Sequence, residues 1–264
     1  MPTPRFRRGA ALLGLAVIAA SAAASRVATS PAAVTGAPTA ATGDVSDVHV
    51  DSAVLHGTVQ PNGLATSYHF EFGRGNRLPR STRAQVVTGT APVAVSAPVA
   101  RLAWGTGYRY RLVATNPAGS HTGETKTFTS LDPRLGGRFT VRARVRRGGR
   151  PFHQHRGDVV RRDYRFAAHC PGALCPSVTL KRRGKRGFFG SGLNRRRAGV
   201  YAGVERFGGG RCDDGLRFKS RTRVFVRVVA LDGDRARRVK GKLRPRVSGC
   251  VHGSERATFG ARRR

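Results

Sequence analysis

Apolar and polar residues alternate with a period of two along much of the chain beyond residue 50. The clearest stretches are residues 68–72 and 108–112, in which aromatic or aliphatic side chains are separated by polar ones. Because successive side chains of a β-strand point to opposite faces, this period predicts half-buried strands. Turn-forming Pro, Asn and Gly follow at 61–63, 73–75 and 116–119. The pattern favours an all-β protein.

The same period returns beyond residue 138 and predicts a second β domain. The Gly-rich connections and even spacing favour one antiparallel barrel or sandwich of about eight strands, connected as an up-and-down meander. It resembles C-terminal modules of uncharacterised secreted actinobacterial proteins, a likeness that implies no activity. The expected strands are 139–145, 164–168, 177–182, 187–193, 200–207, 222–231, 237–247 and 257–261.

Over about residues 38–130 the chain resembles the fibronectin type III-like modules of secreted actinobacterial proteins. The segments that carry the likeness are 55–63, 66–73, 102–116 and 128–130. The most specific of them, Leu-Ala-Trp-Gly-Thr-Gly-Tyr at 102–108, is similar to the tyrosine-corner segment of that family. The resemblance implies a β-sandwich in which the hydroxyl of Tyr108 bonds to the backbone and pins a crossover between the sheets. The family usually has proline where Trp104 stands.

The first 25 residues predict a cleaved export signal. Three arginines precede an apolar run at 10–20, and small residues follow at 21–25. The run is shorter than the ~20 residues that a bilayer requires, so we expect no transmembrane segment after cleavage. The product would be secreted or associated with the cell envelope. The expected division is a signal peptide at 1–25, a linker at 26–38, a fibronectin type III-like domain at 39–130, a linker at 131–138 and a basic, cysteine-containing β domain at 139–261.

Positive charge is concentrated in the second half of the chain. The formal net charge is +35, and residues 131–264 carry 37 Lys and Arg against 9 Asp and Glu. An arginine-rich composition alone does not account for so few acids. An excess of this size predicts attraction to polyanions.

Two expected strands carry ladders of cations at every second position. On a strand such residues share one face, while the small and apolar residues between them face inward. The ladders are the candidate polyanion-binding residues, although a solvated face without a ligand remains the alternative. Their members are Arg142, Arg144 and Arg146 in one strand, and Arg238, Lys240, Lys242, Arg244 and Arg246 in the other.

The four cysteines, Cys170, Cys175, Cys212 and Cys250, all lie in the second domain. In an exported chain this even number indicates two disulfides, for which three connectivities are possible. Sequence proximity favours Cys170 with Cys175, which leaves Cys212 for Cys250. Zinc is the alternative, but the spacing is poor and we expect no metal and no cofactor.

No nucleophile elbow, P-loop, dinucleotide-binding glycine motif or helical metalloprotease pair occurs in the sequence. Arg156-Gly157-Asp158 spells an adhesion tripeptide, which an Arg- and Gly-rich chain contains readily by chance. We therefore expect no catalytic residues and no enzyme activity. A cell-wall glycan hydrolase that uses Asp213, Asp214 or Glu205 is the rival class.

The expected function is that of a secreted, non-catalytic binding or scaffolding protein. The basic domain would dock on an anionic cell-wall polymer, an acidic glycan or another polyanion, and the fibronectin-like domain would act as a spacer or protein-contact module. The alternative is a structural envelope protein without a specific ligand. Few aromatic residues accompany the cations, which disfavours sequence-specific recognition of nucleic acid.

Overall fold

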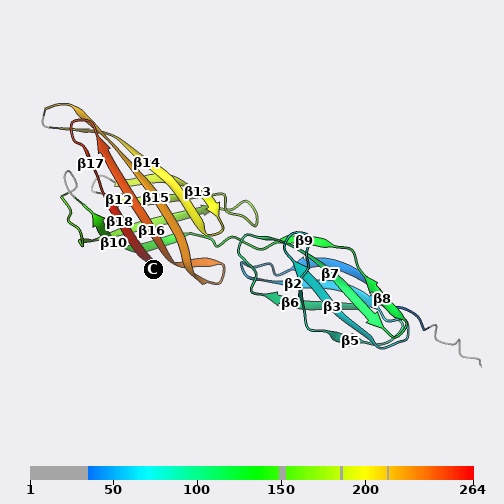
Figure 1. Ribbon diagram of the computed structural model, residues 1–264. Helices are drawn as coiled ribbons and strands as arrows, with labels where there is room; N and C mark the ends of the chain where they lie inside the picture. The colour runs from blue at the N-terminus through cyan, green and yellow to red at the C-terminus, as the bar shows by residue number, and fades with distance from the viewer. Residues whose placement is uncertain (1–34, 149–152, 185–186, 213) are drawn as a thin grey trace, which may run out of the picture. The chain divides into compact units, whose positions relative to one another are not determined.

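The computed structural model describes residues 35–148, 153–184, 187–212 and 214–264. All regular structure in these residues is β-strand, arranged as two successive domains, a sandwich and then a barrel (Figure 1). The all-β prediction is confirmed. Within this part of the chain no helix long and apolar enough to cross a membrane is present. The expected signal peptide and most of the first expected linker lie outside the described residues.

The first domain is a sandwich of two antiparallel sheets. One sheet has the order β1-β2-β6, and the other has the order β4-β3-β7-β8, with β5 paired to β3 and β9 paired to β7. The strands are β1 (Thr39–Ser46), β2 (Ser52–Gln60), β3 (Thr66–Gly73), β4 (Arg80–Ser81), β5 (Gln85–Val87), β6 (Val93–Ala100), β7 (Gly107–Asn116), β8 (Gly119–Thr122) and β9 (Lys126–Thr129).

The core of the sandwich forms from the inward residues of both sheets. Leu55 of β2, Phe70 of β3 and Leu112 of β7 are fully buried there. Tyr108 at the start of β7 is also buried, and its hydroxyl accepts a hydrogen bond of 2.7 Å from the backbone N–H of Ala103. This bond ties β7 to the segment that precedes it. It is the kind of contact that the tyrosine-corner resemblance implies.

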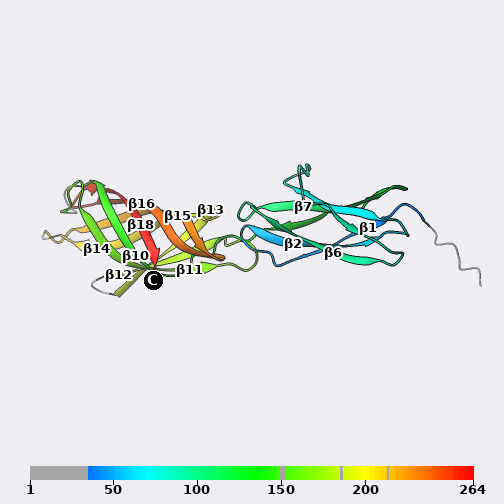
Figure 2. The ribbon, with the colours of Figure 1, turned by 90° about the horizontal axis from the view of Figure 1, so that it is seen from below.

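The second domain is a closed barrel of eight antiparallel strands. The strands from β10 to β16 pair consecutively in sequence order, including β15 with β16. β18 pairs with both β10 and β16, so the ring closes (Figures 1 and 2). A short β17 (Gly253–Ser254) pairs with β16 outside the ring. The ring strands are β10 (Gly137–Arg147), β11 (Val159–His169), β12 (Ser177–Gly184), β13 (Gly187–Arg197), β14 (Val200–Arg211), β15 (Arg217–Asp232), β16 (Arg235–Ser248) and β18 (Arg256–Arg263).

The predicted meander is confirmed strand by strand, but most strands are longer than expected. β15 begins at Arg217 rather than at residue 222. Its first residues alternate cations with Phe218 and Ser220, a pattern that the expected strand left out. The segment 131–138, expected to be a linker, also has a structural role. Leu135 is fully buried in the barrel core, and Asp132 is 1% exposed. The two leucines of this short segment, Leu131 and Leu135, give no strand or helix period from which this could be predicted.

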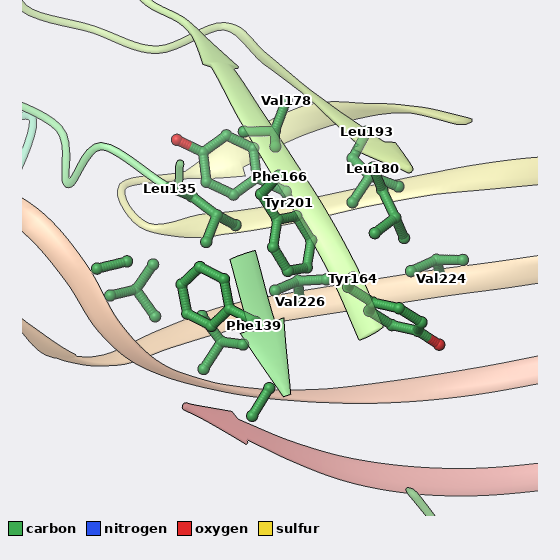
Figure 3. Packing of buried hydrophobic residues seen from close by; sticks show 14 of the residues in the cluster. Leu135, Phe139, Tyr164, Phe166, Val178, Leu180, Leu193, Tyr201, Val224 and Val226 are labelled. Atoms are coloured by element: carbon green, nitrogen blue, oxygen red, sulfur yellow. The ribbon is translucent and has the colours of Figure 1, made fainter. Parts of the chain in front are cut away.

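Apolar side chains fill the end of the barrel at which β10 begins. Phe139, Phe166, Tyr201 and Leu135 crowd together there, and the rings of Phe139 and Phe166 meet edge to face at 5.3 Å between centroids (Figure 3). Tyr164 lies at the edge of this cluster with its hydroxyl pointing away from it (Figure 3). The packing of aromatic and branched residues seals this end of the barrel.

Two disulfides lie in the barrel domain. Cys170 is bonded to Cys175, with 4.1 Å between their Cα atoms, and Cys212 is bonded to Cys250, with 6.4 Å. This is the connectivity that sequence proximity favoured. The first closes the β11–β12 connection, and the second ties the β14–β15 turn to the end of β16.

Candidate polyanion-binding face and barrel interior

Both predicted cation ladders lie on the outside of the barrel. Every member of the β16 ladder, Arg238, Lys240, Lys242, Arg244 and Arg246, is exposed, and so are Arg142, Arg144 and Arg146 of β10. The residues between them, such as Val239 and Val141, are buried in the interior. The strand alternation assumed from the sequence therefore holds in both strands.

The strand register brings the two ladders onto one face. Strand β18 lies between β10 and β16, and it places Gly260 between Lys240 and Arg142. Thr258 likewise lies between Lys242 and Arg144. Neighbouring strands are about 4.8 Å apart, so β10 and β16 lie about 10 Å apart with β18 between them. At the two positions named above, the outward residues of β18 are small.

Strand β15 extends this face with cations that sequence reasoning missed. Arg221, Arg223 and Arg227 are exposed and lie opposite Arg246, Arg244 and Lys240 respectively. Residues 217–227 show the same alternation as the two ladders, so the signal was present in the sequence. Together with Arg262 of β18, which lies opposite Arg238, these residues and the two ladders form what we call the basic face.

The basic face holds its charges without neutralising partners. None of the ion pairs formed within the described residues includes one of its cations. Cations that lie directly opposite each other on paired strands repel, which destabilises the sheet. A face built in this way costs folding free energy, and a bound polyanion would offset that cost.

The arginine run at 195–197 does not contribute to the basic face. Arg195 binds the buried carboxylate of Asp132 through Nε at 2.6 Å and Nη2 at 3.2 Å. The same carboxylate accepts the backbone N–H of Cys175 at 3.0 Å. This ion pair fixes the segment before β10 to the barrel, so Arg195 has a structural role that the sequence did not indicate.

The end of the barrel where β10 finishes is hollow. A cavity of about 690 Å³ opens there, lined by residues from all eight strands of the ring, with β13 contributing only Gly190. Within it Arg182 of β12 forms an ion pair with the buried Glu205 of β14 and donates from Nε to Oε1 at 3.2 Å. Sequence reasoning missed this cavity because it exists only once β15 and β16 close the ring.

The two described carboxylates of the rival hydrolase hypothesis, Glu205 and Asp214, form separate local contacts. Glu205 is paired with Arg182 inside the barrel. Asp214 accepts the backbone N–H of Leu216 in the β14–β15 turn, where Gly215 adopts a φ of +80°. Asp213 lies outside the described residues. Cys212 and Cys250, which approach Asp214 closely, are joined in a disulfide.

Histidines and the adhesion tripeptide also have local explanations. The carboxylate of Asp158 accepts the backbone N–H of His155 at 2.7 Å and so closes its own turn. His153 and His155 belong to no group of three or more metal-ligating side chains within the described part of the chain.

No protein-family model matches the chain, and no curated protein matches it in sequence. Among solved structures, two forms of the sensor domain of the anti-sigma factor RsgI4 in Pseudobacteroides cellulosolvens are similar to part of it. The longer form is 18% identical, with a TM-score of 0.28, and the match covers 35% of this chain and 87% of that one. The shorter form is 19% identical, with a TM-score of 0.29, and the match covers 35% of this chain and 92% of that one.

Proposed function

We propose that this chain is a secreted, non-catalytic protein that docks on anionic polymers through the basic face of its barrel. The observation that carries the proposal is the register of β15, β16, β18 and β10, which arrays the cations on one continuous surface. In this role the sandwich acts as a fibronectin type III-like spacer or protein-contact module. The two disulfides are compatible with an extracellular location.

The spacing of the basic face suits a flexible polymer with a repeating negative charge. Side chains on one strand recur about every 7 Å, and adjacent strands are about 4.8 Å apart, so an anionic chain could contact several cations along or across the strands. Contacts of this kind release counterions, and the affinity should fall steeply as salt rises. The chemistry fits a wall polymer, an acidic glycan or another polyanion alike.

The carboxylates described above support the non-catalytic part of the proposal. A hydrolase needs paired acids that face one substrate. Glu205 and Asp132 instead neutralise arginines, and Asp214 stabilises a turn.

The test compares two variants that lose equal charge. In the ladder variant, Arg238, Lys240, Lys242, Arg244 and Arg246 are replaced by glutamine. In the control variant, five exposed arginines outside the basic face are replaced in the same way, namely Arg77, Arg83, Arg101, Arg196 and Arg197. Arg195 is unsuitable for the control because it binds Asp132.

Binding to immobilised teichoic-type polymer and to heparin is measured from 50 mM to 500 mM salt. The ladder variant should bind both polymers at least tenfold more weakly at low salt and show a flatter salt dependence, whereas the control variant should change little. Equal losses in the two variants would leave only a generally cationic protein. Activity on wall glycans that disappears in a Glu205→Gln or Asp214→Asn variant would favour the hydrolase.

A further inference from the structure

The cavity of the barrel has two chemically different walls. The wall made by β16, β18 and β10 is apolar, with Leu243, Val247, Ala257 and Val145 facing the space. The opposite wall, made by β11, β12, β14 and β15, carries polar groups that face the same space, namely Arg162, Tyr164, Arg182, Glu205, Ser220 and Thr222. A cavity divided in this way fits a molecule with an apolar body and a polar end.

The floor of the cavity is closed by packed aromatic rings. Tyr164 meets Phe166 at 6.2 Å and Phe259 at 5.9 Å, both edge to face. Below them lies the filled half of the barrel. A ligand therefore enters from the open end and stops at Tyr164, with room set by the volume of about 690 Å³.

Arg162 faces the cavity without an acidic partner among the described residues. Glu205 neutralises Arg182. Arg162, two residues before Tyr164 on β11, forms no ion pair with any described carboxylate, and its Nη1 bonds only to the carbonyl oxygen of Arg161 at 3.2 Å. Arg206 also lines the space.

The carboxyl group of Glu255 also lines the cavity, beside the apolar wall. It is 7% exposed and has no cationic partner within the described residues. Burial raises the pKa of Glu255 above its usual range, which shifts the group toward the neutral form. The cavity thus offers the free guanidinium group of Arg162 at its polar wall, while Glu255 lies beside the apolar wall.

We infer that the open end of the barrel binds a single-chain anionic amphiphile of the alkyl carboxylate type. The alkyl chain lies along the apolar wall of β16, β18 and β10, and the carboxylate pairs with Arg162 at the polar wall. This site is separate from the basic face, because it lies inside the ring and the cations of the face point outward.

The adjacent residues Arg161 and Arg162 provide a matched test. Arg162 faces the cavity, whereas Arg161 lies opposite Arg142 on the outer surface. Isothermal titration of the purified protein with decanoate should show one site. An Arg162→Gln variant should bind decanoate about tenfold more weakly, and an Arg161→Gln variant should bind it like the parent. Equal losses in the two variants would overturn the inference, because they would indicate attraction by overall charge.

The length and head group of the ligand test the two walls separately. Affinity should rise about fourfold for each methylene from octanoate to decanoate, because each one is buried against the apolar wall. Decanol and decylammonium should bind more weakly than decanoate, and Arg162→Gln should leave decanol unchanged. No binding, no dependence on chain length, or a preference for decylammonium would each overturn the inference.

A cavity-filling variant, Val160→Trp, should abolish decanoate binding while polyanion binding remains. If that variant fails to fold, the comparison of Arg161→Gln with Arg162→Gln and the chain-length series still test whether the cavity binds decanoate. The ladder variant provides the reverse control, since it should lose polyanion binding and retain decanoate. The two proposals can therefore fail independently.

Discussion

Replacing the five cations of β16 with glutamine is expected to make the barrel more stable. Four of them lie directly opposite a cation on a paired strand: Arg246 opposite Arg221, Arg244 opposite Arg223, Lys240 opposite Arg227, and Arg238 opposite Arg262. Glutamine keeps a polar side chain at each exposed position and removes the charge, and with it the repulsion. The change should therefore act mainly through electrostatics.

The magnitude follows from the geometry of the pairs. Two like charges about 7 Å apart in water repel by about 0.6 kcal/mol, a value within the range of about 0.2 to 1 kcal/mol for cross-strand pairs. Four pairs give about 2 kcal/mol at low ionic strength. Screening with a Debye length of about 8 Å should reduce this to about 1 kcal/mol at physiological salt, and 1 M salt should nearly abolish it.

The assay is urea unfolding at 10 mM and 1 M sodium chloride, followed by hydrogen exchange in peptides from the β15–β16 hairpin. These peptides report on the barrel separately from the sandwich. The control variant with glutamine at Arg77, Arg83, Arg101, Arg196 and Arg197 should show little gain, because those residues are not placed opposite cations. A ladder variant that is no more stable than the parent at 10 mM salt, or whose gain persists at 1 M, would refute the reasoning.

Three further predictions concern stability. Tyr108→Phe should destabilise the sandwich by about 1 kcal/mol in chemical denaturation, because the N–H of Ala103 loses its acceptor; a variant as stable as the parent would contradict the corner assignment. Asp132→Ala should destabilise the barrel by about 2 to 3 kcal/mol, because Arg195 loses its carboxylate; an Asp132→Ala barrel that unfolds at the same urea concentration would show that the pair is dispensable. Gly241→Ala should cost about 1 to 3 kcal/mol by calorimetry, because a Cβ there would overlap the ring of Phe259 and the backbone carbonyl oxygen of Phe225, and an unchanged melting temperature would mean that both can move aside.

Much of the barrel could be predicted from local pattern. Stretches such as Phe139-x-Val141-x-Ala143 predict both a strand and the face of it that points inward. The same alternation predicts that the cations between them point outward. The register between strands could not be predicted, and neither could the position of β18 between the two ladders. The position of β18 depends on its pairing with β10, whose residues are more than 100 positions away, such as Arg144 with Thr258.

The polar contacts inside the barrel were also not predicted, because they form only when the ring closes. Arg182 and Glu205 look like ordinary polar residues of two strands, and only ring closure turns them toward one another. Arg182 lies two positions from the buried Leu180, and Glu205 lies four positions from the buried Tyr201, so strand alternation places both charged side chains on the inward face. This spacing was a usable signal, since a charged residue at an inward position needs a partner. Asp132 gave no such signal, because its segment has no period at all.

Ring closure also limits how this protein can meet other proteins. An open sheet exposes backbone N–H and C=O groups on its outermost strands, where an extended peptide can add itself as a further strand. In the barrel ring every strand has a neighbour on both sides, but β13 and β14 pair only through residues 194–197 and 200–202, so strand addition is closed to the ring except along the rest of that seam. In the sandwich, β1 and β6 are the outer strands of their sheet and keep one side open. A peptide partner recruited through its backbone would therefore join the first domain at β1 or β6, or the barrel only along the seam between β13 and β14, and every other ligand of the barrel must be recognised by side chains.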